Sequence, residues 1–154
     1  MNEISDFEIR RETDIARLVK WRAEVIANVF GHVSGPQFNQ LIEANTEYLR
    51  KHLADATHVS LMASAGGEDI GSGDLCIYDE MPSPDNPTGV CAYLMNIYVR
   101  KPFRNKGVAS AIVARLIAEA TRRGAGKIYL ETTDEGRDLY KKTGFKPMKG
   151  YMKL

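Results

Sequence analysis

The chain has 154 residues, of which 44% are hydrophobic and 27% charged. These values are typical of one compact folded domain, so we expect residues 1–154 to form a single domain. The net charge of +1 argues against nucleic acid and acidic membrane surfaces as partners. No stretch approaches the roughly 18 apolar residues of a membrane span. The acidic start, MNEISDFEIR, lacks the apolar core of a signal peptide. We therefore expect a cytoplasmic protein.

The first half of the chain predicts two helices between short strands. Phe7–Arg10 alternates apolar and polar residues, as a strand does. Thr13 or Asp14 is suited to cap the helix that follows, whose apolar residues recur at helical spacing to Val29. The next segments are a turn at Gly31–Pro36, a second helix with an apolar stripe from Phe38 to Leu53, and a hairpin of strands at 58–64 and Ile70–Tyr78.

The second half predicts a buried strand followed by a helix. Asp79–Gly89 is rich in proline and other turn formers and reads as a surface loop. Val90–Val99 is almost continuously apolar, which indicates a central strand covered on both faces. A helix ending at Gly124, a strand at Lys127–Thr133, a short helix before Gly144, and a strand or hairpin over residues 145–154 complete the prediction.

This order of elements predicts the fold class. The strand, helix and strand from Val90 to Thr133 require parallel pairing through a right-handed crossover. The hairpin is antiparallel, so the sheet is mixed. Helices packed on it give an α+β domain of three layers.

A cluster of positive charge lies where the helix after the central strand begins. Arg100, Lys101, Arg104 and Lys106 precede Gly107. The positive end of the helix dipole disfavours these cations unless an anion is bound there. The unpaired N–H groups of the first turn, with a glycine that permits close approach, form such a cradle, most plausibly for a pyrophosphate. The alternative is a solvated basic turn without a ligand. A P-loop and a dinucleotide fingerprint are excluded by spacing, because Gly107 is the only glycine of this stretch.

Three motifs together resemble a known family. Arg104-Asn105-Lys106-Gly107-Val108-Ala109 matches the Arg/Gln-x-x-Gly-x-Gly/Ala signature of the GNAT N-acetyltransferases, which bind acetyl-coenzyme A. The strand LMNIYV precedes this signature, and LYKKTGF (Leu139–Phe145) is similar to the family's Leu-Tyr-x-x-x-Gly-Phe motif. The element order agrees over nearly the whole chain.

The resemblance implies how acetyl-CoA binds. The strands Val90–Val99 and Lys127–Thr133 would splay apart and receive pantetheine between them, and an N–H near Ile97 would polarise the thioester carbonyl and stabilise the oxyanion. Residues implied in cofactor binding are the end of the central strand (Ile97, Tyr98, Val99) and the signature with the residue after it (Arg104, Asn105, Lys106, Gly107, Val108, Ala109, Ser110). No metal is implied.

Two residues are catalytic candidates. Tyr140 falls on the family's tyrosine and would donate a proton to the departing thiolate, although a tyrosine here can also be purely structural. Glu131, at the end of its strand, is a candidate base for the amine, with a solvated strand-end acid as the alternative. Many members carry asparagine where this chain has Thr133, which could cap the next helix instead.

The remaining polar and aromatic residues give weaker signals. Asn96 and Tyr98 share a strand face and either line a pocket or form core hydrogen bonds. Residues of the first two helices and their loop (Trp21, Phe30, His32, Phe38 and Tyr48) are candidates for the acceptor cleft or for the core. His32, His52 and His58 are expected at the surface, and Cys76 and Cys91 as reduced core thiols.

The expected function is acetyl transfer from acetyl-CoA to a primary amine of a small molecule, peptide or protein. The alternative is a CoA-binding sensor of the same fold without turnover. A nucleic-acid binder is disfavoured by the near-zero net charge. The apolar end around Met148–Leu154 could pair across subunits, which would give a homodimer.

Overall fold

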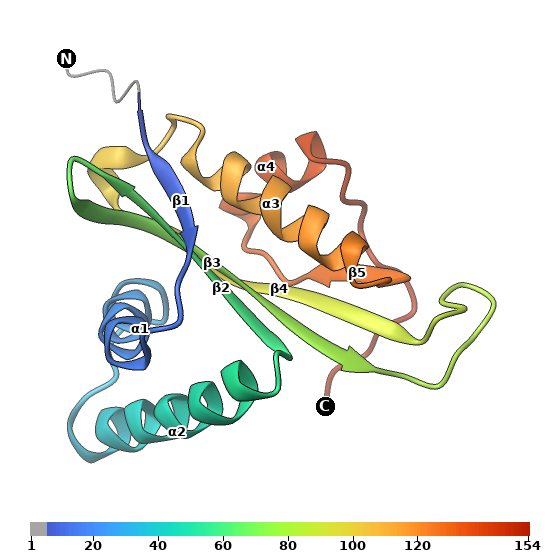
Figure 1. The fold of residues 1–154 in the computed structure, drawn as a ribbon, viewed down its shortest axis with the longest axis horizontal. Helices are drawn as coiled ribbons and strands as arrows, with labels where there is room; N and C mark the ends of the chain where they lie inside the picture. Colours follow the sequence, from blue (N-terminus) through green and yellow to red (C-terminus); the bar gives the residue numbers. More distant parts are fainter. Residues whose placement is uncertain (1–5) are drawn as a thin grey trace.

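The computed structural model describes residues 6–154, which form three layers. A five-stranded sheet of order β1-β2-β3-β4-β5 has α1 and α2 on one face and α3 and α4 on the other (Figure 1). β4 and β5 are parallel, and all other neighbours are antiparallel. The predicted mixed sheet and three-layer fold are confirmed. Met1–Ser5, half of the acidic segment MNEISDFEIR, lie outside the described residues.

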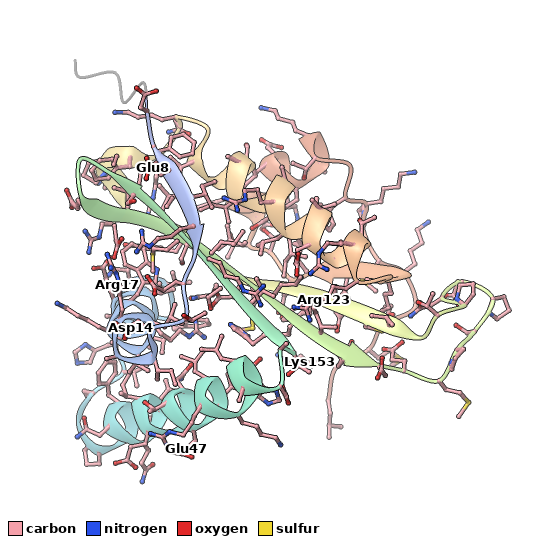
Figure 2. The ribbon with its side chains drawn as sticks, in the orientation of Figure 1. Glu8, Asp14, Arg17, Glu47, Arg123 and Lys153 are labelled. Atoms are coloured by element: carbon pink, nitrogen blue, oxygen red, sulfur yellow. The ribbon has the colours of Figure 1, made fainter. Side chains whose placement is uncertain are left out.

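The bounds of the elements follow the sequence pattern closely. The strands are β1 (Glu8–Arg11), β2 (His58–Ala65), β3 (Glu68–Asp79), β4 (Val90–Val99) and β5 (Lys127–Leu130). The helices are α1 (Ile15–Val29), α2 (Gly35–Ala54), α3 (Val108–Arg122) and α4 (Arg137–Lys142), with short 3-10 turns η1 (Lys101–Phe103) and η2 (Asp134–Gly136). Charged side chains such as Glu47 on α2 and Arg17 on α1 lie on the outer surfaces (Figure 2).

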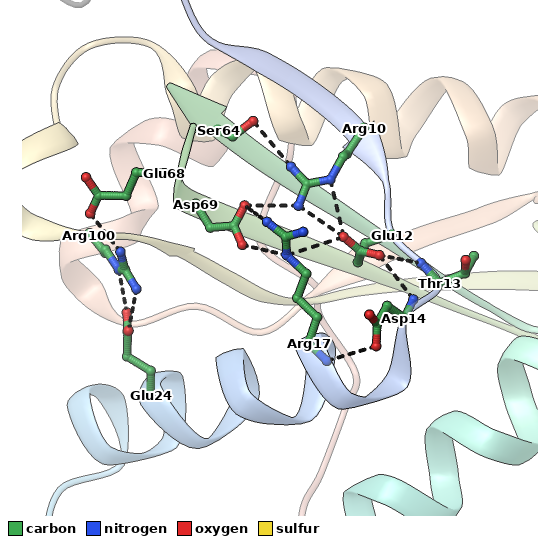
Figure 3. Close-up of polar contacts among 10 residues, drawn as sticks. All are labelled: Arg10, Glu12, Thr13, Asp14, Arg17, Glu24, Ser64, Glu68, Asp69 and Arg100. Carbon is green, nitrogen blue, oxygen red and sulfur yellow. Dashed lines mark hydrogen bonds and ion pairs between the residues drawn. The ribbon is translucent and has the colours of Figure 1, made fainter. Parts of the chain in front are cut away.

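Helix α1 is fixed at its start by a cap and by ion pairs. Asp14 is the N-cap, and its Oδ1 accepts a hydrogen bond of 3.2 Å from the Arg17 backbone N–H. The Asp69 carboxylate on β3 accepts hydrogen bonds from Arg17 Nε at 2.8 Å and from Arg10 Nη2 of β1 at 3.0 Å. Arg10 also forms an ion pair with Glu12 (Figure 3). The network joins β1, β3 and α1 into one unit.

Each face of the sheet carries its own core. Leu75, Leu94, Ile112 and Leu116 are at most 1% exposed and pack β3 and β4 against α3. On the opposite face, buried side chains join α1 and α2 to the sheet: Leu18, Trp21, Val25, Leu49, Met62 and Tyr98. A Cβ at Gly73 would lie 2.5 Å from Ile112 Cγ2, so this glycine of β3 permits the close approach of α3.

A bulge in β4 positions the site. Ser72 pairs with Tyr98 and Asp74 with Met95, so two β4 residues, Asn96 and Ile97, lie opposite Gly73 alone. Asn96 adopts φ +55°, a left-handed conformation that asparagine tolerates better than most residues. The bulge places Met95 and Asn96 on the same sheet face, toward α1 and α2.

The end of the chain departs from the prediction. Residues 145–154 form neither a strand nor a hairpin, and β5 ends at Leu130 rather than at Thr133. The tail contains Lys146, Pro147, Lys149 and Gly150, and proline and glycine weaken a ladder. It passes β5, where Lys127 Nζ lies 5.1 Å from the centre of the Tyr151 ring. The strand on which we based dimer pairing is therefore absent, and the homodimer stays a prediction.

Candidate active site

The turn between β4 and α3 has the geometry of an anion cradle. Asn105 (φ +60°) and Gly107 (φ +82°) are both left-handed and turn the chain into the helix. The first helical bond runs from the Ala111 N–H to the Gly107 carbonyl at 3.0 Å. No side chain caps the helix and its first turn holds no acidic residue. The N–H groups of the first turn, Val108 to Ser110, are thus available to an anion.

The basic side chains around this turn have different roles. Lys101, Arg104 and Lys106 are exposed beside the cradle. Arg104 folds back onto β4: its Nε donates to the Val99 carbonyl at 2.8 Å, and its guanidinium lies 5.7 Å from the centre of the Tyr98 ring. Arg104 therefore links the end of β4 to the cradle.

Arg100 corrects the interpretation of the basic cluster. Its guanidinium pairs with Glu24 of α1 at 2.8 Å and with Glu68 of β3 at 2.9 Å (Figure 3). It also stacks 4.9 Å from the centre of the Trp21 ring. The Glu24 hydrogen bond, followed by the Coulomb attraction of both acids, raises the pKa of Arg100 above its ordinary value despite partial burial. Two carboxylates compensate its charge, so Arg100 braces α1 and is not a phosphate ligand.

The parallel strands β4 and β5 separate beside the cradle. Their pairing ends at Leu94 and Leu130, whereas β4 continues to Val99. From Met95 onward, the β5-facing edge of β4 has no strand partner within residues 6–154. Ile97, Tyr98 and Val99 all lie on this edge, directly before the cradle. The gap and the cradle are consecutive along the chain, as one elongated ligand requires.

A large cavity lies on the α4 side of this gap. It has a volume of about 610 Å³, and its lining includes Leu130, Glu131 and Tyr140. Tyr140 is 9% exposed and packs edge-on against Phe145 with ring centres 5.9 Å apart. Burial raises the pKa of the Tyr140 hydroxyl above its ordinary value, which keeps it protonated at neutral pH. Glu131 is exposed. Thr133 occupies the N-cap position of η2 but forms no side-chain capping bond, so the predicted cap is wrong.

A second, smaller cavity lies on the opposite face of the sheet. Its volume is about 210 Å³, and it is enclosed by α1, α2 and strands β2 to β4. Its polar lining residues are Arg22, Asn45, Tyr48, His58, Ser60, Asp74, Cys76 and Asn96. Met95 and Asn96, the first β4 residues beyond the last β5 pair, line it as well, so this cavity adjoins the gap.

His58 is in this second cavity, which corrects its predicted place at the surface. It is 3% exposed, because β2 begins beneath α2. Its Nδ1 lies 2.9 Å from Tyr48 Oη and its Nε2 lies 3.6 Å from Asp74 Oδ2. Desolvation lowers the pKa of His58, but hydrogen bonding to Asp74 and Cys76 outweighs it and raises the pKa to about 9. His58 is therefore charged at neutral pH.

Asn96 connects the charged groups of the second cavity. Its Nδ2 donates to Asp74 Oδ2 at 2.7 Å, and its Oδ1 accepts from Arg22 Nη1 at 2.8 Å. Asp74 Oδ1 is buried and has no hydrogen-bond partner. The two interpretations left open for Asn96 both hold, because it lines a pocket and forms buried hydrogen bonds.

Comparison with known proteins agrees with this geometry. Residues 26–145 match the model of the acetyltransferase (GNAT) family. This chain is a member of the GNAT family. The match includes the bulge, the gap, the cradle and Tyr140, so the resemblance seen in the sequence is confirmed. A search of curated protein sequences gives no match.

Solved GNAT structures share the whole fold. A "predicted acetyltransferase" from Clostridium acetobutylicum, solved with acetyl-CoA, is 26% identical with a TM-score of 0.87, over 97% of this chain and 96% of that one. A GCN5-related N-acetyltransferase from Ralstonia eutropha is 24% identical with a TM-score of 0.81, covering 97% and 98%. Glucosamine-6-phosphate N-acetyltransferase from Arabidopsis thaliana is 20% identical with a TM-score of 0.69, covering 97% and 98%. The last two, at these identities, are evidence of the fold alone.

The GNAT fold gathers most of the predicted site residues. Ile97 to Val99 lie along the gap, Arg104 to Ser110 form the turn after it, and Tyr140 and Glu131 line the cavity beside it. Sequence reasoning missed Asp74 and Arg22, whose only signal is a single charged residue in the middle of β3 and on the apolar face of α1. In residues 6–154 no helix is long and apolar enough to cross a membrane, and no group of three or more His, Cys, Asp or Glu is arranged to hold a metal ion.

Proposed function

We propose that this GNAT protein is an enzyme that transfers the acetyl group of acetyl-CoA to a primary amine. The observation that carries the proposal is the continuous path from the open edge of β4 into the start of α3. Within residues 6–154 no strand pairs with the β5-facing edge of β4 beyond Leu94, and no side chain caps α3, so a bound ligand would satisfy backbone donors at both places.

The residues fit the coenzyme, which supplies an acetyl thioester when bound. The N–H groups of Val108 to Ser110 would hold its diphosphate, and the exposed Lys101 and Lys106 lie close enough in sequence to add positive charge. The backbone of Ile97 to Val99 would pair with the pantetheine amides. Gly107 leaves space at the cradle, because a Cβ there would meet nothing within 4 Å.

The chain's own groups would handle the protons of the transfer. Tyr140 Oη would donate its proton to the thiolate that leaves when the amine nitrogen bonds to the acetyl carbon and the carbon–sulfur bond breaks. The nitrogen loses a proton, for which Glu131 in the same cavity is the proposed acceptor. The raised pKa of Tyr140 keeps its proton in place until the thiolate forms.

A direct assay tests this proposal. Acetyl-CoA is offered with a panel of primary amines, thiol release is followed with a dye, and mass spectrometry detects acetylated products. We expect turnover on at least one amine and a rise in the melting temperature with CoA. A thermal shift without turnover on any amine would overturn the proposed enzyme in favour of a CoA-binding sensor.

A further inference from the structure

The small cavity beneath α1 and α2 has the size of a small molecule. Its volume of about 210 Å³ lies below the roughly 300–1,000 Å³ of pockets for drug-sized ligands. Met95 and Asn96 form part of its lining at the point where β4 parts from β5. If the chain acetylates amines, as its proposed function requires, an acceptor in this cavity would lie beside the gap that receives the coenzyme. Its amine would then lose its proton to Asp74 rather than to Glu131, which lines the cavity on the opposite face of the sheet.

One end of the cavity carries a positive charge that no acid compensates directly. The Arg22 guanidinium donates to Asn96 Oδ1 and lies 5.6 Å from the centre of the Phe30 ring. Within residues 6–154 it forms no ion pair, whereas Arg100 of the same structure has two. Burial lowers the pKa of Arg22, which shows that its charge is poorly solvated. An anionic group in the cavity would stabilise it.

The other end of the cavity lacks a hydrogen-bond donor. The Asp74 side chain is 10% exposed. Its Oδ2 faces Asn96 and His58, but no donor of residues 6–154 reaches its buried Oδ1. A buried carboxylate oxygen without a donor is destabilising unless a ligand supplies one. An amine N–H is such a donor.

The net charge of the cavity determines which kind of amine fits. Asp74 and charged His58 neutralise one another, so the charge of Arg22 remains in excess. A simple amine would add to that excess as a cation and would leave it in place as a neutral amine, whereas a carboxylate would cancel it. A molecule with both an amine and a carboxylate would match both ends.

We propose that the cavity binds an acceptor of amino-acid type, with its carboxylate on Arg22 and its amine N–H on Asp74 Oδ1. This assignment rests on the proposed acetyl transfer. Asn96 holds the two charged side chains at a fixed separation, because it bonds to both. The site thus selects small amines that carry an anionic group over amines that do not.

Matched acceptors test the selectivity. Glycine, alanine and β-alanine are compared with their carboxamides and with ethylamine as acetyl acceptors. We expect kcat/KM to be higher by about 10- to 150-fold for the carboxylates, the range of a charge-assisted hydrogen bond. Equal or better rates with plain amines or peptide lysines would overturn this inference and leave the proposed acetyl transfer intact.

Variants and a binding measurement make the test independent of turnover. Arg22→Gln should abolish the preference for carboxylates, whereas Lys20→Gln, which removes one exposed charge from the same helix, should retain it. Calorimetric titration of the CoA-saturated protein with alanine should give binding in the wild type and none in Arg22→Gln. If no amine is acetylated, the proposed function fails, and Arg22-dependent alanine binding would still support the cavity's ligand class. Absence of alanine binding to the wild type would overturn it.

Discussion

Two glycines at opposite ends of α3 allow the anion cradle to be tested by a matched pair of variants. Gly107 precedes the helix with φ +82°, and Gly124 follows it with φ +79°. A Cβ at either position would meet nothing within 4 Å. We therefore consider Gly107→Glu and Gly124→Glu, which add the same side chain to the same backbone conformation.

The expected stabilities of the two variants differ in a defined direction. A left-handed conformation costs an L-residue about 1–2 kcal/mol, and both variants incur it. A carboxylate at the helix N-terminus is stabilising by ~0.3–1 kcal/mol and one at the C-terminus is destabilising by a similar amount. Gly107→Glu should thus be more stable than Gly124→Glu by roughly 1 kcal/mol, which is about 2–4 °C in melting temperature for a chain of this size.

Coenzyme binding should follow the opposite order. The carboxylate of Gly107→Glu would lie among the N–H groups that we assign to the diphosphate. Two like charges about 4 Å apart near a protein surface repel by ~4 kcal/mol, so affinity should fall at least about 100-fold after screening by salt. Gly124→Glu should bind CoA like the wild type. Calorimetric titration with CoA measures both affinities, and thermal unfolding measures both stabilities.

One result would refute the assigned cradle. If Gly107→Glu bound CoA with wild-type affinity, the diphosphate would not lie at the start of α3. If both variants lost affinity to the same degree, general destabilisation would explain the loss.

Three further predictions concern catalysis, packing and pH. Tyr140→Phe should lower kcat by about 100-fold or more while leaving CoA affinity unchanged, because only the proton donor is removed. Gly73→Ala should lower the free energy of unfolding by about 1–3 kcal/mol, since the added methyl overlaps α3, and thermal unfolding measures this. Burial of Asp69 raises its pKa, but hydrogen bonds from Arg17 and Arg10 outweigh it and hold the pKa below its ordinary value. The contribution of Asp69 to the free energy of unfolding is therefore complete above its ordinary pKa and is lost as the pH falls through its lowered pKa in the folded protein. Asp69→Asn should be about 2 kcal/mol less stable than the wild type at pH 7, and its stability should depend less on acid pH.

Each of these predictions has a control. Equal kcat in Tyr140→Phe and the wild type would show that Tyr140 is not the proton donor. Gly71→Ala places its Cβ 3.2 Å from its nearest neighbours instead of 2.5 Å and should cost less than Gly73→Ala; the reverse order would contradict the packing argument. Parallel acid-denaturation curves for Asp69→Asn and the wild type would show that the ion pairs contribute no pH dependence.

The sequence predicted the fold because its strongest local patterns agree with one another. The apolar run Val90–Val99 and the helix to Gly124 appear within a residue or two of the expected bounds. The prediction for residues 145–154 was wrong because their apolar residues fit a strand pattern, but no neighbouring strand pairs with them. Strand pairing depends on residues that are distant in the sequence, so local propensity does not predict it.

The part of the candidate site that consists of local backbone could be predicted from the sequence. The part that consists of side chains far apart in the sequence could not. The turn at Gly107 is local, so one glycine and a signature identify it. Arg22, Asp74 and Asn96 meet only because the bulge of β4 faces α1, and spacing along the chain gives no sign of it. The burial of His58 was also missed, because the chain folds β2 back beneath α2 and residue spacing does not show this packing.

The additional residue in β4 leaves the alternation of the strand intact. Met95 and Asn96 share the face toward α1 and α2, so Ile97, Tyr98 and Val99 point to the faces they would occupy if Ile97 followed Met95 directly. The bulge therefore adds one polar side chain to the small cavity without moving the residues that precede the cradle. Deletion of Asn96 should keep Ile97, Tyr98 and Val99 on their present faces while removing the amide that joins Arg22 to Asp74.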